Sequence, residues 1–345
     1  MRRTILVALL ALGALLTSVF CASAQTDADQ RGVGIRLVEV PSDRSDDPRA
    51  QQYIIDHVGQ GETIVRQVQV VNHEPVASTV RVYAGGAAID DTSFQPSDRQ
   101  EDQAVARWAV LDRSSIELPA EGSETLKATI TVPADAPDGE RYGVIWAELP
   151  GAESDSGVTV VNRVGIRIYL SVGEGSEPAS DFEVDTLTAA RDADGTPVVA
   201  AKVHNTGGRA LDMSGQLELT DGPAGLSAGP FPAELGTTLG IGETGDVHVP
   251  LDPEIPDGPW NATLTLRSGE LERTVRATIT FPAEAGEVGE AVDAERVTDS
   301  IPGLILAGIA LLLALLVLGG LLWYLRRRND EDEDDALTPA RELSS

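Results

Sequence analysis

The sequence predicts an all-β protein with two sandwich domains in tandem and one transmembrane helix near the C-terminus. Apolar and polar residues alternate in short runs such as "TIVRQVQVVN", "STVRVYA" and "VGIRIYLSV", each bounded by Gly, Pro, Asp or Asn. This alternation is typical of short β-strands. A second observation is an internal repeat: "ETLKATITVPADAPDG" from Glu124 aligns without a gap with "ETGDVHVPLDPEIPDG" from Glu243. The third is the uncharged run of residues 303–325, described below.

The first residues predict a secretory signal peptide, residues 1–24. Arg2 and Arg3 precede an apolar run, and Ala22-Ser23-Ala24 has the small-x-small pattern of a cleavage site. The chain has a single cysteine, Cys21, and bulky Phe20 occupies the position where a lipidation site needs a small residue. The mature protein is therefore expected to have no disulfide and no thiol nucleophile.

The repeat predicts how strands and turns are built in each half. In both copies alternate apolar residues would share one strand face, namely Ala128, Ile130 and Val132 in the first and Val247, Val249 and Leu251 in the second. Pro-Asp-Gly then follows at 137–139 and 256–258, which suits a tight turn. Upstream, Asn72 and Asn205 each stand at a predicted strand end, where the side chain can bond to the turning backbone.

These shared features predict two immunoglobulin-like β-sandwich domains, residues 31–175 and 178–283, joined by the short hinge "EGSEP". An acidic linker would follow at 284–302. Residues 303–325 are long enough to cross about 30 Å of hydrocarbon as a helix. The positive-inside rule then places residues 326–345, which begin with three arginines, in the cytoplasm. The protein is thus expected at the cell membrane as a single-pass protein with an extracellular N-terminal ectodomain.

The two halves differ after the Pro-Asp-Gly turn. In the second half Trp260 and the alternate residues after it are apolar, whereas the residues between them are polar. In the first half the corresponding polar face is replaced by Tyr142, Val144 and Trp146. One interpretation makes Tyr142 a tyrosine corner and Trp146 part of a thicker core. The other makes Trp146, with Trp108 and Tyr142, an aromatic surface for sugar rings or a protein partner.

The acidic composition argues against nucleic-acid binding, and the lack of catalytic motifs argues against enzyme activity. The formal net charge is −29, and so acidic a surface repels nucleic acid. The histidines have no paired spacing, and neither an HExxH nor a G-x-S-x-G motif occurs. "RDADGT" from Arg191 lacks the remaining ligands of a calcium loop, so a hairpin turn at Asp194-Gly195 explains it better. We therefore expect no enzyme activity, no cofactor and no metal, although the acidic loops leave calcium open.

The order of parts resembles the WxL-protein-interacting cell-surface proteins of Gram-positive bacteria. The resemblance rests on "GQGET", "VVN", the "VPADAPDGERYG" turn and the closing strand "NRVGIRIYLSV", and covers roughly residues 33–172. It implies a peptidoglycan-binding first domain and a host- or partner-binding second module. The second domain departs from that family, since it reads as a shorter, generic immunoglobulin-like unit.

Two functional hypotheses follow. The first is a non-enzymatic, membrane-anchored surface protein whose first domain binds cell-wall peptidoglycan or a wall-associated protein. The alternative is an extracytoplasmic assembly chaperone or adaptor that captures a secreted subunit by β-strand addition, since tandem immunoglobulin-like domains with open sheet edges suit that role.

Overall fold

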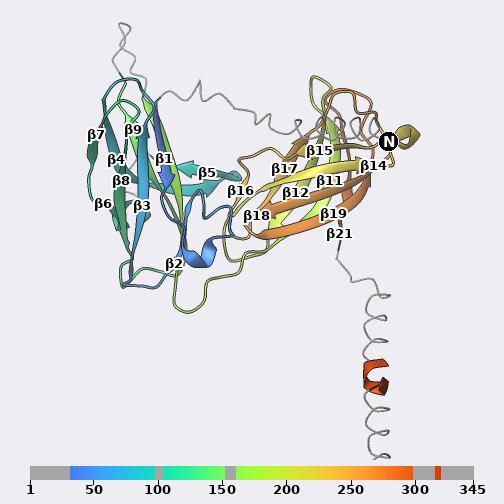
Figure 1. Cartoon of the computed structure of the whole chain (residues 1–345). Helices are drawn as coiled ribbons and strands as arrows, with labels where there is room; N and C mark the ends of the chain where they lie inside the picture. The colour runs from blue at the N-terminus through green and yellow to red at the C-terminus, as the bar shows by residue number, and fades with distance from the viewer. Residues whose placement is uncertain (1–31, 98–103, 152–160, 298–314, 320–345) are drawn as a thin grey trace, which may run out of the picture.

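The computed structural model describes residues 32–97, 104–151, 161–297 and 315–319, and it is composed mostly of β-strands in two sandwich domains (Figure 1). The predicted signal peptide, residues 1–24, and the tail, residues 326–345, lie outside the described residues. Of the predicted membrane segment, only residues 315–319 are described, and they are helical. No helix within the described residues is long and apolar enough to span a membrane. The transmembrane helix at 303–325 stays a prediction.

Domain one packs two sheets face to face. One sheet has the order β1-β3-β8-β6, and the other has the order β2-β10-β9-β4-β5, with β7 paired to one end of β4. A short 3-10 helix and a short α-helix connect the strands. The bounds are β1 (Val33–Leu37), η1 (Ser42–Arg44), β2 (Ile54–Val58), β3 (Thr63–Asn72), β4 (Ser78–Asp90), β5 (Ser93–Pro96), α2 (Ala104–Trp108), β6 (Ala109–Leu111), β7 (Ser115–Leu118), β8 (Ser123–Thr131), β9 (Gly139–Leu149) and β10 (Asn162–Val172).

Domain two is also a sandwich of two sheets. Its sheets have the orders β17-β12-β11-β20 and β15-β14-β18-β19-β21, with a small sheet of β13 and β16 beside them. The bounds are β11 (Phe182–Arg191), β12 (Pro197–Asn205), β13 (Leu211–Asp212), β14 (Ser214–Thr220), η2 (Pro223–Gly225), β15 (Ala228–Pro232), β16 (Thr238–Leu239), β17 (Thr244–Pro250), β18 (Trp260–Ser268), β19 (Leu271–Ile279), β20 (Val288–Asp293) and β21 (Glu295–Arg296).

The strand orders confirm the tandem repeat. The path β1-β3-β8 in domain one corresponds to β11-β12-β17 in domain two, and β10-β9-β4-β5 corresponds to β19-β18-β14-β15. The repeated segment therefore forms the same strand, turn and following strand in both domains, β8 to β9 and β17 to β18. Its alternate apolar residues are buried in both copies, namely Ala128, Ile130, Val132, Val247, Val249 and Leu251.

The turns and the polar face also match the sequence prediction. Gly139 and Gly258 end the two Pro-Asp-Gly turns with φ of 114° and 115°, a region that side chains other than Gly rarely adopt. Burial alternates along β18, with Trp260 in the core and Asn261 exposed. At the predicted hairpin between β11 and β12, the Gly195 amide donates to the Asp192 carbonyl at 2.8 Å.

The predicted boundary between domain two and an acidic linker at 284 is wrong. β20 pairs with β11 and β21 pairs with β19, so residues 288–293 and 295–296 belong to the sandwich. Acidic composition obscured these strands, because edge strands expose most of their side chains. Within the described residues, all strands and the cores of both sandwiches lie in residues 32–297.

Candidate functional site at the domain junction

An aromatic cluster joins the two domains. Tyr142 and Tyr169 stand on the outer face of their sheet with ring centroids 5.9 Å apart, and Phe94 lies 5.4 Å from Tyr169. With Ile55, these rings pack against Ala210 of domain two. Domain two therefore covers this end of the outer sheet face of domain one. This contact explains why that end of the face is apolar.

The hairpin of β4 and β5 extends this contact to domain two. The amide of Thr238 donates to the carbonyl of Thr92 at 2.8 Å, and Ser93 forms an isolated β-bridge with Thr237. In Figure 1, the tip of the β4-β5 hairpin extends from domain one toward β16 of domain two. The backbone of one domain is thus hydrogen-bonded to that of the other.

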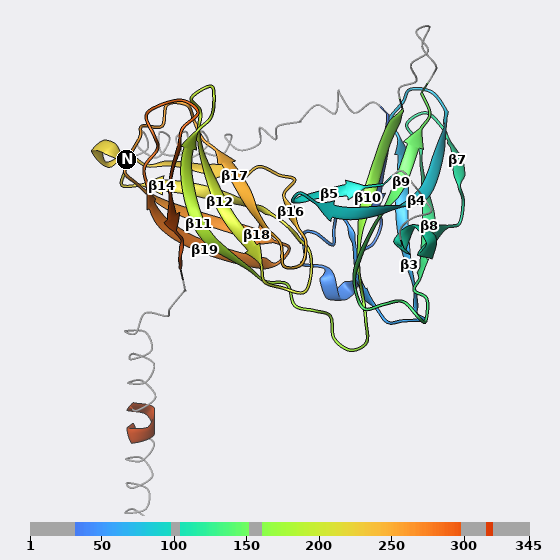
Figure 2. The same cartoon turned by 180° about the vertical axis from the view of Figure 1, so that it is seen from behind.

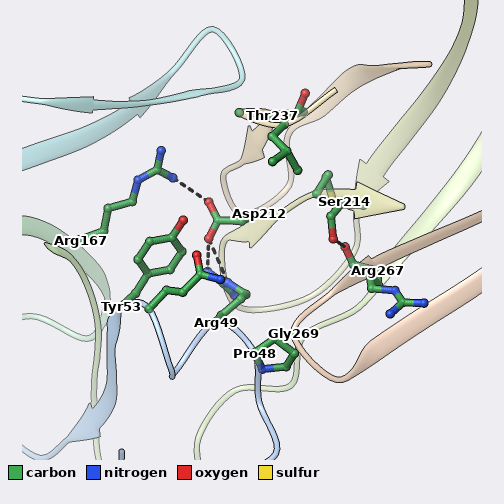
Figure 3. Close-up of a pocket in the computed structure, with 13 residues that line it drawn as sticks. Pro48, Arg49, Tyr53, Arg167, Asp212, Ser214, Thr237, Arg267 and Gly269 are labelled. Carbon is green, nitrogen blue, oxygen red and sulfur yellow. Dashed lines mark hydrogen bonds and ion pairs between the residues drawn. The ribbon is translucent and has the colours of Figure 1, made fainter. Parts of the chain in front are cut away.

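Asp212 is the polar centre of the junction (Figure 3). Its carboxylate accepts hydrogen bonds from Arg49 Nε at 2.9 Å and from Arg167 Nη1 at 2.9 Å, both from domain one. The hydroxyls of Tyr169 and Thr238 donate to the same carboxylate at 2.8 Å each. Two guanidinium groups share this single carboxylate, so the centre has an excess positive charge inside a strongly acidic chain.

Burial and charge at this centre shift several ionisation equilibria. Burial alone would lower the pKa of the Arg49 guanidinium, but Asp212 and its neighbours outweigh this effect, so the pKa is raised. Burial, reinforced by the Asp212 charge, raises the pKa of Tyr169 above its ordinary value. Burial and Glu140 do the same to the pKa of Tyr142. Both tyrosines therefore act as neutral hydrogen-bond donors over the whole physiological pH range.

A second polar cluster ties the predicted hinge to both domains. Glu140 of domain one accepts from the backbone amide of Ala210 at 2.7 Å and from the Tyr142 hydroxyl at 2.8 Å. Arg209 of domain two forms an ion pair with Glu177 in the connecting segment. Arg44 of domain one reaches the other oxygen of Glu177 at 2.5 Å. These contacts connect the "EGSEP" segment to both domains through Glu177.

Beside Asp212 lies an open pocket of about 400 Å³. Both domains contribute to its wall, and Arg49, Arg167, Asp212 and Arg267 provide its charged groups (Figure 3). The lining residues are Pro48, Arg49, Gln52, Tyr53, Arg167, Asp212, Met213, Ser214, Leu235, Gly236, Thr237, Arg267 and Gly269.

The free edge of β10 leads to this pocket. β2 pairs in parallel with residues 168–172 of β10, and β9 pairs with the entire strand. At its start β10 lies beside β1, where the Val33 amide donates to the Asn162 side chain at 3.4 Å. Among the described residues, residues 164–167 of β10 pair with no strand on the side away from β9. Figure 2 shows β10 at the side of domain one that faces domain two. Arg167, the last residue of the free edge, is also part of the pocket wall.

The three aromatic residues predicted to bind a ligand lie in three different environments. Trp146 stands on the outer face of β9 but is only 8% exposed, and the Arg163 guanidinium covers its ring at 4.2 Å from the centroid. Trp108 ends α2 and packs against the core of domain one. Tyr142 belongs to the domain junction. The structure does not bring them together into one aromatic surface.

Two interpretations of the apolar face need correction. Tyr142 is not a tyrosine corner, because its hydroxyl donates to the Glu140 side chain rather than to upstream backbone. Trp146 is not part of a thicker core, since it lies outside the buried clusters and on the opposite face of β9 from Ile145. The ring fits flat on the sheet because Gly85 and Gly165 stand on either side, where a Cβ would approach within 3.0 Å of Trp146.

Sequence reasoning missed Arg49, Arg167 and Asp212. Arg49 lies in the acidic loop "DRSDDPRA", residues 43–50, where Asp47 accepts a hydrogen bond from the Arg49 amide at 2.8 Å. No group of three or more potential metal ligands occurs in the part of the chain that the structure describes. No spacing in the sequence relates the three residues, because they come together only when the domains dock.

No protein-family model matches the chain, and no curated protein matches it. The resemblance to the WxL-interacting family therefore stays an expectation. Similar solved structures include a chain from the complex of the SafA pilin with the SafB chaperone of Salmonella enterica, with 9% identity and a TM-score of 0.40 over 72% of this chain and 97% of that chain. The YadV chaperone has 12% identity and a TM-score of 0.38 over 77% and 99% of the two chains. The E. coli chaperone DraB has 12% identity and a TM-score of 0.35 over 77% and 96%. Similarity at this level is distant and carries no conclusion about what this chain binds.

Proposed function

We propose that this chain is a non-enzymatic protein-binding protein, which takes an extended segment of a secreted or surface protein onto the free edge of β10 as an added strand. The observation that carries the proposal is that residues 164–167 of β10, among the described residues, have no strand partner on the side away from β9. Alternate backbone N–H and C=O groups of an edge strand point away from its partner strand. Four residues give an edge of about 13 Å, long enough for a few main-chain hydrogen bonds.

The surroundings of the edge suit an extended segment. On its inner side, Val164 and Ile35 are partly buried apolar residues at the seam between the two sheets, so they can pack against alternate side chains of an added strand. At its end, the segment reaches the pocket with Arg49 and Arg167. The excess positive charge there suits an acidic group on the segment.

Three other edges of the described strands are less suited. β15 contains Pro230 and Pro232, which lack the N–H that a neighbouring strand needs. β5 is bridged to domain two through Ser93. β21 has only two residues. The half-free β10 therefore combines length, available backbone groups and an adjoining pocket.

A cross-linking experiment in the native host tests the proposal. The photoreactive residue p-benzoylphenylalanine would replace Val161, which is exposed and directly precedes β10, or Leu226, an equally exposed control in domain two. We expect one segment of a secreted or surface protein to cross-link at 161 and not at 226. Mass spectrometry identifies the segment, and the synthetic peptide is then titrated by fluorescence anisotropy.

A substitution at the edge gives the decisive comparison. Val164→Lys puts an inward-pointing charge on the free edge, a feature that blocks strand addition. Val288→Lys adds the same charge to the β20 edge, where Val288 is already 70% exposed. Peptide affinity should fall about tenfold or more, equivalent to about 1.4 kcal/mol, only in the first variant. Equal affinity in both variants would contradict binding at β10.

Peptidoglycan binding by the first domain stays a prediction, as does display of the protein outside the membrane. The aromatic surface expected to carry glycan binding is not exposed at Trp146 or assembled with Trp108, so the structure favours strand capture. Sedimentation of residues 25–300 with stripped peptidoglycan sacculi distinguishes the two functions. Saturable, salt-tolerant co-sedimentation that Val164→Lys leaves unchanged would favour the wall.

A further inference from the structure

Leu235, in the loop between β15 and β16, is the most exposed large apolar side chain among the described residues, at 82%. It belongs to neither sandwich core and lines the pocket at the domain junction instead. A single exposed leucine on an ordinary surface needs no explanation. Leu235, however, lines the pocket to which the free edge of β10 leads, so a segment bound along that edge and into the pocket would cover it.

The backbone on both sides of Leu235 is fixed by hydrogen bonds. Before it, the Glu234 amide donates to the carbonyl of His248 at 2.8 Å. After it, the carbonyl two residues later accepts from the Met213 amide at 2.9 Å. Between these bonds Gly236 turns the chain with φ of 115°, a conformation that other residues rarely adopt. The loop is therefore already ordered, and a partner that covers the leucine does not have to order the backbone around it.

The pocket has an apolar part as well as a charged part. Pro48 and Tyr53 of domain one line it together with Leu235 of domain two (Figure 3). The Tyr53 ring packs against the ring of Tyr169, with centroids 5.8 Å apart. The pocket volume is about 400 Å³, whereas one water molecule takes about 30 Å³ of liquid. The two oxygens of a carboxylate would thus leave most of the pocket unfilled.

We infer that Leu235 contacts the captured segment and selects a large apolar side chain beside its acidic group. The inference rests on the proposed strand capture and adds the chemistry of the segment to it. Three arginines and one aspartate line the pocket, so its charged part suits a carboxylate. Its apolar part suits a neighbouring Leu, Ile, Met or Phe, because covering apolar surface on both partners removes it from water. Domain two thereby takes part in recognition, through a side chain that domain one cannot supply.

Selection from a phage-displayed library of random peptides on the purified full chain tests the inference. We expect the selected peptides to carry Asp or Glu beside a large apolar residue. Selection on Leu235→Ser should keep the acidic preference and lose the apolar one. The control is Leu226→Ser, at an exposed leucine that does not line the pocket, and it should select the same peptides as the unchanged chain.

A double-mutant cycle with a selected peptide distinguishes direct contact from an effect on folding. Fluorescence anisotropy compares the peptide with a variant that has Ser at the apolar position, on the unchanged chain and on Leu235→Ser. Each single change should weaken binding about tenfold, equivalent to about 1.4 kcal/mol. Both changes together should weaken it little further, because they remove the same contact. Urea unfolding of Leu235→Ser should match that of the unchanged chain, since the side chain is exposed.

The outcomes separate this inference from strand capture itself. Peptides that lose binding in Val164→Lys but show no apolar preference, or that bind Leu235→Ser with unchanged affinity, would overturn the inference and leave strand capture in place. Additive costs in the cycle would overturn it as well. If no selected peptide is sensitive to Val164→Lys, strand capture is contradicted, and the inference fails with it.

Discussion

Asn72 and Asn205 make the same two hydrogen bonds in the two domains. Each side-chain amide donates to the carbonyl four residues later, Val76 or Arg209, at 2.8 Å. Each Oδ1 accepts from the amide two residues later at 3.0 Å. Both side chains are buried, and each belongs to the last residue of its strand, β3 or β12. The Asn side chain thus supplies hydrogen bonds to the backbone of the turn, which no neighbouring strand provides there.

Replacing Asn205 should destabilise domain two more than replacing an exposed Asn. Its amide also donates to the carbonyls of Leu239 and Gly240, so Asn205→Ala leaves several buried carbonyls without a donor, at a cost of about 2–3 kcal/mol. Asn261→Ala, on the exposed face of β18, should cost about 0.5 kcal/mol or less. Urea unfolding, followed by hydrogen-exchange mass spectrometry to resolve the domains, measures both. Equal costs would show that the buried network is not what stabilises this turn.

Asp212→Ala should separate the domains without unfolding them. The substitution leaves Arg49 buried without its carboxylate partner, and breaking such a pair typically costs about 3–5 kcal/mol when it is fully buried. Because the Asp212 side chain retains 16% exposure, we expect the lower end of that range. Small-angle scattering should show a larger radius of gyration with both cores intact. Glu272→Ala breaks an exposed pair with Arg267 and is expected to leave the scattering unchanged.

Stability should fall as the pH rises above about 10. Burial raises the pKa of Tyr142 and Tyr169 in the folded chain, whereas unfolded tyrosines ionise near pH 10. A raised folded-state pKa gives stabilisation that is complete below the unfolded value and is lost as the pH increases above it. Absorbance of tyrosinate, measured with and without urea, should show delayed ionisation only in the folded protein. The double variant Tyr142→Phe/Tyr169→Phe should lose most of this delay.

Ending the chain at residue 283 should weaken domain two. This truncation removes β20 and β21, which pair with β11 and β19, and it removes Ala294 from its contact with the core. Urea midpoints of chains ending at 283 and at 297 can be compared by the fluorescence of Trp260, which lies in that core. We expect a lower midpoint for the shorter chain. Identical midpoints would support a linker that begins at 284.

The local and repeating features of the fold were predictable from the sequence. Alternation identified the buried faces of β8, β17 and β18, and the two Asn residues and the two Pro-Asp-Gly turns identified matching positions in the domains. The turns depend on residues that are close together in the chain. Burial of one strand face leaves a pattern in which apolar and polar residues alternate. β20 and β21 left no clear pattern, since edge strands with acidic side chains resemble a solvated linker.

The sequence by itself determined that the chain has two related β-sandwich domains, because hydrophobic periodicity and turn-forming residues can be recognised in short stretches of consecutive residues. Only the tertiary structure decided which aromatic residues are exposed, which edge is free and how the domains dock. Trp146 is covered by Arg163 from the neighbouring strand, and Asp212 receives Arg49 and Arg167 from another domain. Contacts of this kind join residues far apart in the chain, and their free energies depend on burial and charge that exist only after the sheets have packed.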